Sequence, residues 1–211
     1  MRGLTGKVLI RYDGFRVNLL LIKAKLVPSF ELGWADGIKR CVSPHFNSRP
    51  DNEVSLLVIH NISLPAGCFD TPFIGQLFQG CLDIAADPSF KDLEGLEVSA
   101  HFLIRRDGNI IQYVSCDERA WHAGVSSFHG RQGCNDFAVG IELEGTDTQD
   151  YTELQYQELV RLTLGLMARY PMLNLDAIVG HCDIAPGRKT DPGDCFDWIR
   201  YKHELTLGLS Q

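Results

Sequence analysis

The fold of this chain is decided by one continuous apolar run, Val54-Ser55-Leu56-Leu57-Val58-Ile59-His60. A run of this kind, without regular polar alternation, is typical of a β-strand that is buried on both faces of a sheet. Such a strand needs a neighbouring strand on each side and a packed layer above and below. We therefore expect residues 54–60 to form a central strand, with His60 at its end.

Two segments that follow along the chain predict a hairpin. Val98–Ile104 has the pattern of a second strand, and Arg105–Gly108 follows it as a turn with glycine where a positive φ is needed. Asn109–Val114 then returns as the partner strand.

The segment Phe137–Leu143 predicts another strand with two different faces. Its alternation places Phe137, Val139, Ile141 and Leu143 on one face, because successive side chains of a strand point in opposite directions. Gly140, Glu142 and Glu144 must then lie on the other face. A short strand, Ala177–Val179, precedes Gly180 and His181.

One helix is predicted to begin at Thr152, with Gln155 as its capping-box partner. Its buried stripe consists of Leu159, Leu162, Leu166 and Tyr170, and Pro171 ends it. A last helix is expected within Phe196–Leu205. Strands and helices in this order predict one α/β domain, in which helices flank a central mixed β-sheet.

Residues 1–30 differ in character from the rest of the chain, being basic with short apolar patches. The apolar run at 17–22 is stopped by Lys23 and Lys25, so it is shorter than the apolar region of a signal peptide. We interpret residues 1–30 as an N-terminal extension and residues 31–211 as the domain. The failed signal pattern indicates a cytoplasmic protein.

Composition limits the classes of partner. The 211 residues carry a formal net charge of -7, and 45% of them are hydrophobic. An acidic surface repels phosphate backbones, which argues against nucleic acid, and no stretch is apolar enough to span a membrane. The seven cysteines lack CxxC spacing, which indicates free thiols in a reducing compartment and argues against a disulfide framework.

Three residues at predicted strand ends or in the following loops have metal-ligand chemistry: His60, His181 and Asp191. Two imidazoles and one carboxylate, with a fourth position open, match a catalytic zinc site. Spacing alone leaves alternatives: either histidine can be a hydrogen-bonded structural residue, Asp191 can start a turn, and Asp183 can compete as the ligand. Lys189 lies two residues from Asp191 and favours the interpretation as a metal site. A cation beside a metal ligand is unfavourable unless it faces negative charge that develops during a reaction.

Four motifs resemble those of one known family. They are Val58-Ile59-His60-Asn61, Ala120-Trp121-His122-Ala123-Gly124, the segment 140–147 (GIELEGTD) and the segment 180–193 (GHCDIAPGRKTDPG). Their order and content are similar to the AmpD family of cytoplasmic 1,6-anhydro-N-acetylmuramyl-L-alanine amidases, within the type 2 amidase and peptidoglycan-recognition superfamily. The resemblance runs from about Glu31 to the last helix.

The resemblance implies a zinc-dependent amidase that cleaves the bond between a muramyl sugar and the L-alanine of its stem peptide during peptidoglycan recycling. Its substrate would be a small anhydromuropeptide, and we expect a monomer. It also implies a role for each site residue: His60, His181 and Asp191 as zinc ligands, Glu142 as the catalytic acid/base, Lys189 as the stabiliser of the charged intermediate, and Asn61, Trp121 and His122 as residues of the substrate cleft.

Some alternatives stay open. Glu144 shares a strand face with Glu142, and spacing does not separate the two. Relatives often carry an arginine just before Cys134, where this chain has Gly133, which leaves Arg131 as the candidate for holding peptide carboxylates. Two other functions use the same motifs: a peptidoglycan-recognition module that binds without cutting, and an exported amidase that acts on the wall itself.

Overall fold

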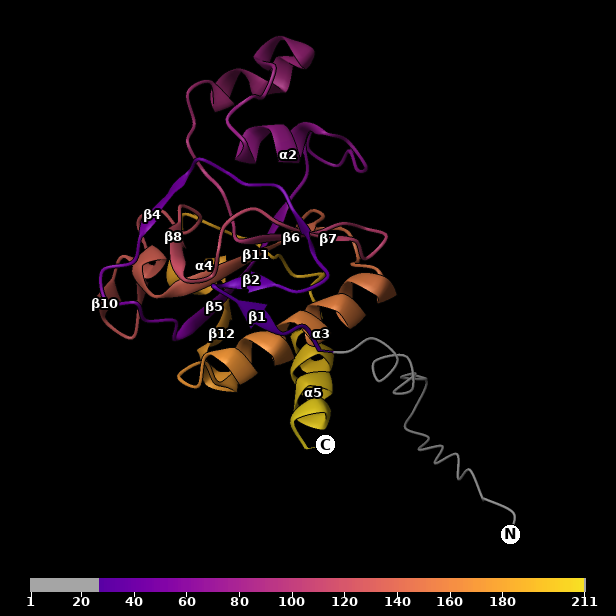
Figure 1. Ribbon diagram of the computed structural model, residues 1–211. Helices are drawn as coiled ribbons and strands as arrows, with labels where there is room; N and C mark the ends of the chain where they lie inside the picture. The colour runs from indigo at the N-terminus through magenta and orange to yellow at the C-terminus, as the bar shows by residue number, and fades with distance from the viewer. Residues whose placement is uncertain (1–26, 211) are drawn as a thin grey trace.

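A mixed six-stranded sheet forms the centre of the computed structural model, which describes residues 27–210 (Figure 1). From one edge to the other its strands are β12 (Ile178–Gly180), β5 (Leu56–Ile62), β11 (Ala138–Glu144), β6 (Phe102–Ile104), β7 (Ile110–Gln112) and β3 (Lys39–Arg40). The first four are parallel, β7 is antiparallel to β6, and β3 is parallel to β7. The α/β class and the mixed sheet are confirmed.

The apolar run around residue 57 forms the second strand of the sheet, β5, between β12 and β11. Residues 56–59 are completely buried, because both faces of β5 are covered by other layers. The strand continues beyond His60 to Ile62, two residues further than the sequence predicted.

Helices cover one face of the sheet. They are α3 (Glu153–Arg169) and α5 (Trp198–Leu209), which pack beside each other below the sheet in the view of Figure 1. The predicted capping box is present at Thr152 and Gln155. The predicted stripe of α3 packs in one core cluster with Leu57, Ile59 and Ile141 from the strands.

The opposite face of β5 and β11 carries a second cluster, which includes Leu56, Val58 and Ile184. Phe137 also belongs to this cluster, so its predicted place beside Val139 is wrong. The reason is local: Phe137 ends a short 3-10 turn, Cys134–Asp136, and lies before the strand begins at Ala138, so the strand alternation does not extend to it.

A lobe lies on the side of the sheet away from α3 and α5 (Figure 1). It consists of α2 (Phe73–Phe78) and the 3-10 turns Ile84–Ala86 and Pro88–Leu93. The remaining elements are α4 (His181–Ile184), the 3-10 turn Leu175–Ala177, and three antiparallel pairs: β1 (Phe30–Glu31) with β2 (Trp34–Ala35), β4 (Phe46–Ser48) with β8 (Glu118–Ala120), and β9 (Ser127–Phe128) with β10 (Arg131–Gln132).

Packing begins before the predicted domain boundary at residue 31. Pro28 lies so close to Gly165 of α3 that a Cβ added there would be 2.7 Å from the Pro28 carbonyl oxygen. Residues 1–26 of the predicted extension lie outside the described residues.

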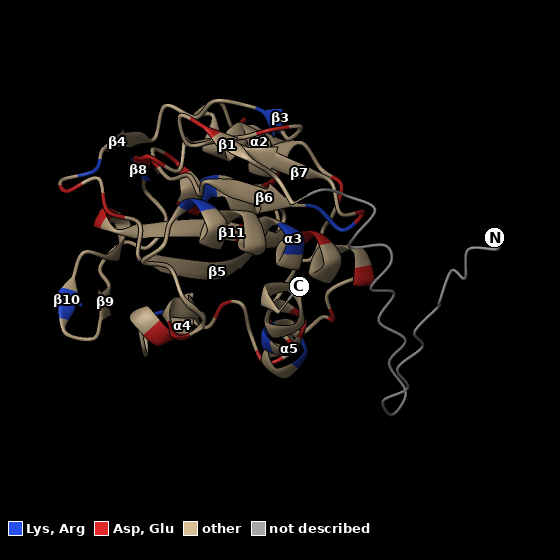
Figure 2. Ribbon diagram, turned by 60° about the horizontal axis from the view of Figure 1, so that its bottom comes forward, with Lys and Arg blue, Asp and Glu red and all other residues tan. Residues whose placement is uncertain are grey.

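Acidic and basic residues are interspersed over the loops and helices (Figure 2). All seven cysteines are free, as predicted. Within residues 27–210, no helix combines the length and the apolar character that crossing a bilayer requires.

Candidate active site

The central strands bring the first two site residues together. β5 and β11 are parallel, and their register pairs His60 with Glu142. Partners across two strands present their side chains on the same face of a sheet. This face is turned away from α3 and α5, because the alternate residues Ile59 and Ile141 point into the core between the sheet and those helices.

His181 comes from the neighbouring strand end. It is the first residue of the four-residue helix α4, directly after β12, which pairs with β5. The loop after α4 then returns to place Asp191 beside both histidines, and Cys182 donates its backbone N–H to the Asp191 carbonyl oxygen at 3.0 Å. The strand-end positions predicted for these residues therefore converge in space.

Three ligand atoms form a nearly equilateral triangle. His60 Nδ1 is 3.0 Å from His181 Nδ1 and 3.0 Å from Asp191 Oδ2, and the third side is also 3.0 Å. Atoms that bind one tetrahedral zinc at about 2.0–2.1 Å lie roughly 3.3 Å apart, so this triangle fits such an ion closely. In the described part of the chain, no other group of three His, Cys, Asp or Glu side chains has a comparable arrangement.

The surroundings of His60 and Asp191 favour the deprotonated forms that bind a metal. Burial lowers the pKa of His60 to about 4, although the hydrogen bond with Asp191 opposes that shift. Burial opposes ionisation of Asp191, but hydrogen bonds with His181 and His60 hold its pKa below the usual range. The neutral imidazole of His60 and the ionised carboxylate of Asp191 are therefore available to a metal at neutral pH.

Asp183, the alternative ligand, lies outside this triangle. It is exposed, and its Oδ2 accepts a hydrogen bond from the Gly180 N–H at 2.7 Å, which caps the start of α4. The same carboxylate is therefore used for local backbone structure.

Glu142 and Glu144 have different surroundings although they share a strand. Glu142 lines the cavity, and its Oε2 is sheltered from solvent with no hydrogen-bond partner among the described residues. Burial raises its pKa well above the usual value, and the charge of Asp191 adds to that effect, while Lys189 opposes it.

Glu144 is fully buried and its oxygens are occupied. Arg105 and the backbone N–H of Asp70 donate to Oε1, and the backbone N–H of Arg106 donates to Oε2. Glu144 therefore connects the sheet to two loops, and it does not line the cavity.

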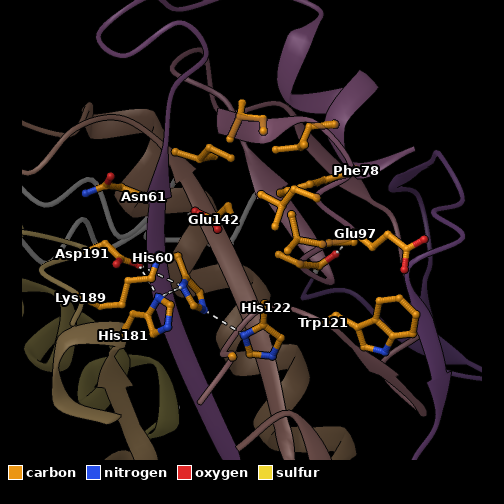
Figure 3. Close-up of a pocket in the computed structure, with 18 of the residues that line it drawn as sticks. His60, Asn61, Phe78, Glu97, Trp121, His122, Glu142, His181, Lys189 and Asp191 are labelled. Atoms are coloured by element: carbon orange, nitrogen blue, oxygen red, sulfur yellow. Dashed lines mark hydrogen bonds and ion pairs between the residues drawn. The ribbon is translucent and has the colours of Figure 1, made fainter. Parts of the chain in front are cut away.

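The cavity has a volume of about 530 Å³ and extends from the metal triangle toward the lobe (Figure 3). Glu142, Lys189 and Asp191 lie at one end, and Trp121 and Glu97 lie at the other. Leu64, Leu77, Phe78, Leu93 and Leu96 from the lobe side supply an apolar wall. The cavity thus combines a polar reactive end with a long apolar wall, which is typical of a site for an extended small ligand.

Lys189 is exposed and lies on the loop between α4 and Asp191. Its side chain points toward the triangle, as Figure 3 shows. Within residues 27–210, no ion pair ties its ammonium to a carboxylate, so the charge is available to a ligand in the cavity.

The residues predicted for the substrate cleft fall into two groups. Asn61, Trp121 and His122 line the cavity. Each also has contacts inside the protein: Asn61 Nδ2 donates to Asp147 Oδ1 at 2.7 Å and to the Pro192 carbonyl, and Trp121 Nε1 donates to Asn47 Oδ1 at 2.7 Å. His122 contacts His60, which the sequence did not predict.

Arg131 lies elsewhere, and the structure does not bring it into the cavity. It forms an ion pair with Glu53 at 2.8 Å, and its guanidinium lies 3.9 Å from the centre of the Phe137 ring. Arg131 belongs to the short hairpin strand β10, and its side chain is held by Glu53 and by the Phe137 ring.

Sequence reasoning missed Arg188 and Asn135, which both line the cavity. Arg188 Nη2 donates to the carbonyl oxygens of Ala123 and Val125, each at 2.7 Å. Asn135 Oδ1 accepts the backbone N–H groups of His122 and Ala123. Their partners are backbone atoms of a distant loop, and a single sequence carries no signal for such contacts.

Comparisons with known proteins agree with this geometry. The family model described as N-acetylmuramoyl-L-alanine amidase matches residues 50–194. The chain is 57% identical to the 1,6-anhydro-N-acetylmuramyl-L-alanine amidase AmpD of Escherichia coli over 173 residues, which cover 82% of this chain and 94% of the relative.

Two solved structures are similar as well. A crystal structure of a selenomethionine derivative of AmpD superimposes with a TM-score of 0.81 and 55% identity, covering 83% of this chain and 98% of that one. AmpDh3 of Pseudomonas aeruginosa in complex with an anhydromuramic pentapeptide gives a TM-score of 0.54 and 27% identity, covering 94% of this chain and 66% of that one.

Proposed function

The chain belongs to the N-acetylmuramoyl-L-alanine amidase family, and on that premise we propose that it hydrolyses the amide bond between 1,6-anhydro-N-acetylmuramic acid and L-alanine. The single observation that carries this proposal is the position of Glu142. Its unpartnered oxygen lies on the same sheet face as a triangle of metal-ligand atoms, at the polar end of a long cavity.

Zinc is the metal that we propose for the triangle. His60, His181 and Asp191 would hold it, and two imidazoles with one carboxylate leave a fourth position open. When bound, zinc supplies Lewis-acid polarisation of a carbonyl and makes water more acidic.

Glu142 acts as the proton carrier. A carboxylate takes a proton from the attacking water and delivers it to the alanine nitrogen as the C–N bond breaks. Burial and the charge of Asp191 raise the pKa of Glu142, and Lys189 opposes that rise. A carboxylate with a raised pKa is a stronger base toward the attacking water than an ordinary glutamate. Its partnerless Oε2 leaves the required lone pair free.

Lys189 stabilises the negative charge that grows on the carbonyl oxygen of the amide. Its ammonium borders the same end of the cavity and is not neutralised by an ion pair within the described residues. A fixed positive charge of this kind contributes most in the transition state, because the oxygen is nearly neutral in the ground state.

The rest of the substrate would occupy the cavity toward Trp121 and the apolar wall. The relative AmpDh3 binds an anhydromuramic pentapeptide, which supports an anhydromuropeptide as the ligand here. We further propose that the protein acts in the cytoplasm as a monomer in peptidoglycan recycling. Close similarity to AmpD and the seven free cysteines support the location.

The reaction can be tested with a defined anhydromuramyl tripeptide in ¹⁸O-labelled water. Hydrolysis at the proposed bond releases a peptide with a free alanine amine, and ¹⁸O enters the carboxylate of the muramyl product. Mass spectrometry that finds binding of the tripeptide without cleavage would favour the recognition module instead. Label in any other fragment would place the scissile bond elsewhere.

A further inference from the structure

Both histidines of the metal triangle make a second contact, and both contacts lead to adjacent residues of one loop. His60 Nε2 lies 2.9 Å from His122 Nδ1, and His181 Nε2 lies 3.1 Å from the Ala123 carbonyl oxygen. The dashed line between His60 and His122 in Figure 3 marks the first contact. The loop comes directly after β8 and is distant in sequence from both ligands.

We propose that His122 and Ala123, held by the side chain of Asn135, form a device that orients both histidine ligands, with His122 as a positioning residue for His60. This inference rests on the proposed function insofar as it takes the triangle to be a metal site. It assigns to His122 a role in the protein's own architecture, distinct from contact with substrate.

The contact with Ala123 fixes the proton on His181. A carbonyl oxygen can only accept, so the 3.1 Å contact with Ala123 assigns the hydrogen to His181 Nε2. The guanidinium of Arg188, a donor at 3.5 Å, lies farther from the same nitrogen and instead donates to the Ala123 carbonyl at 2.7 Å. In a neutral imidazole the other nitrogen then has a free lone pair, and that nitrogen is Nδ1, which faces Asp191 and His60. The Ala123 carbonyl therefore keeps His181 in the tautomer that a metal site needs.

The contact with His122 does the same for His60. For His60 Nδ1 to present its lone pair in the triangle, His60 Nε2 must carry the hydrogen and needs an acceptor. His122 Nδ1 is the nitrogen within hydrogen-bond distance. The two rings are perpendicular, with their centres 5.1 Å apart.

In this arrangement the second ring nitrogen of His122 has no hydrogen-bond partner among the described residues. If His122 Nδ1 accepts, His122 Nε2 carries the hydrogen, and that nitrogen is buried without a partner among the described residues. A buried donor without a partner destabilises the folded protein. A ring retained at such a cost, in contact with a ligand residue, is best explained by that contact.

Space for the His122 ring is created by a glycine. A Cβ on Gly140 would lie 2.5 Å from His122 Nδ1, a distance that real atoms do not tolerate. Gly140 precedes Glu142 by two residues on the same face of β11, so the strand leaves a hollow beside the catalytic carboxylate, and His122 fills it.

Asn135 clamps the loop. Its Oδ1 accepts the N–H of His122 at 3.1 Å and the N–H of Ala123 at 2.8 Å, so one oxygen fixes both residues. Asn135 is only 8% exposed, and its own carbonyl accepts from the buried Arg49 at 3.0 Å. Hydrogen bonds thus connect Arg49 to Asn135, Asn135 to the loop of His122 and Ala123, and that loop to both histidines of the triangle.

The experiment measures zinc affinity without substrate, by competition with a chromophoric chelator at neutral pH. Outer groups that orient metal ligands typically contribute 10–100-fold to affinity. His122→Phe keeps a flat ring but removes the acceptor, and we expect it to weaken zinc binding by about 10–100-fold. His122→Asn places an acceptor oxygen at the δ position, and we expect affinity within about threefold of the parent.

Asn135 supplies an independent pair of variants. Asn135→Leu removes the shared acceptor and should weaken zinc binding in the same way, whereas Asn135→Asp retains an oxygen for both N–H groups and should keep most of the affinity. His45→Phe is the matched control, because His45 is also buried with an unpartnered Nε2 near Trp121 but has no contact with the triangle. It should bind zinc like the parent.

The visible spectrum of cobalt-loaded protein is the second readout, because it reports ligand geometry directly. It should change in His122→Phe and return in His122→Asn. Parent-like zinc affinity in His122→Phe and Asn135→Leu would overturn the inference. It would also be overturned if His122→Asn lost as much zinc affinity as His122→Phe, and Asn135→Asp as much as Asn135→Leu. If the parent chain itself bound no zinc, the proposed function would fail instead.

Discussion

Two glutamates two residues apart on β11 show how much a side chain's role depends on its neighbours. Glu144 receives three hydrogen bonds from Arg105, Arg106 and Asp70, whereas Glu142 has a free oxygen in the cavity. The sequence placed both on one face, which is correct, but it could not separate them. The groups that occupy Glu144 come from two loops whose approach depends on the whole fold.

Glu142→Gln should retain zinc and substrate affinity and lose activity. The amide has nearly the same shape but cannot take up a proton, so we expect kcat to fall by about 10²–10⁴-fold with KM nearly unchanged. Steady-state kinetics on an anhydromuramyl tripeptide measure this. Glu144→Gln is the matched variant, and it should lose stability while kcat changes little. The opposite pattern would mean that the two roles are reversed.

The same Glu142 should destabilise the metal-free protein at high pH. Burial raises its pKa above 4.5, so the unfolded chain releases this proton first as pH rises. The free energy of unfolding therefore decreases from about pH 4.5 upward, until the folded group also ionises. Metal-free Glu142→Gln should have a higher melting temperature than the metal-free parent at about pH 8, and the difference should vanish near pH 4. A difference independent of pH would contradict this assignment.

Lys189→Ala should lower kcat by about 10²–10³-fold with KM nearly unchanged, as expected for the loss of one charge-stabilising group. Lys189→Arg should recover only part of the rate, because a planar guanidinium cannot place a compact charge at the same point. Lys39→Ala, at the far edge strand β3, serves as the control. Equal rates for the parent and both Lys189 variants would show that Lys189 is merely a solvated loop residue.

At the scale of elements, local patterns predicted the helices and strands well where the pattern was long. The capping box at Thr152 and the stripe of α3 follow from side chains within a few residues of one another. Phe137 was misplaced because a 3-10 turn ends there, and nothing in strand alternation marks that boundary. The contact between Asn135 and the His122 loop was also beyond prediction, because it joins segments through one side-chain oxygen.

Gln155 should contribute more to stability than an ordinary cap. Its Oε1 accepts from the Thr152 N–H, and its Nε2 donates to the carbonyls of Glu144 and Ile104, so it ties α3 to the sheet. Gln155→Leu leaves these buried groups without partners and should cost about 2–3 kcal/mol. Thr152→Ala should cost about 1 kcal/mol. Urea unfolding of the metal-loaded protein compares the two, and equal losses would contradict the anchoring role.

At the scale of the molecule, the site depends on a sheet whose strand ends converge. β12, β5 and β11 lie side by side, and they bring His181, His60 and Glu142 to one region although these residues are up to 121 positions apart. The order of strands was not predicted, since a single sequence gives strand existence more readily than strand neighbours. The group His60, His181 and Asp191, which could hold a metal ion, was predicted because its residue types are few and each residue stands at a strand end or in the loop after it.

The metal-dependent reaction is the central claim, and a zinc titration of metal-stripped protein tests it most directly. Rigorously stripped protein is titrated with zinc while turnover of an anhydromuramyl tripeptide and bound metal are both followed, with His60→Ala and His181→Ala measured alongside. We predict no turnover without metal, full recovery at one zinc per chain, and neither bound zinc nor turnover in the two variants. Full turnover by the stripped protein, or by a variant that binds no zinc, would contradict the account.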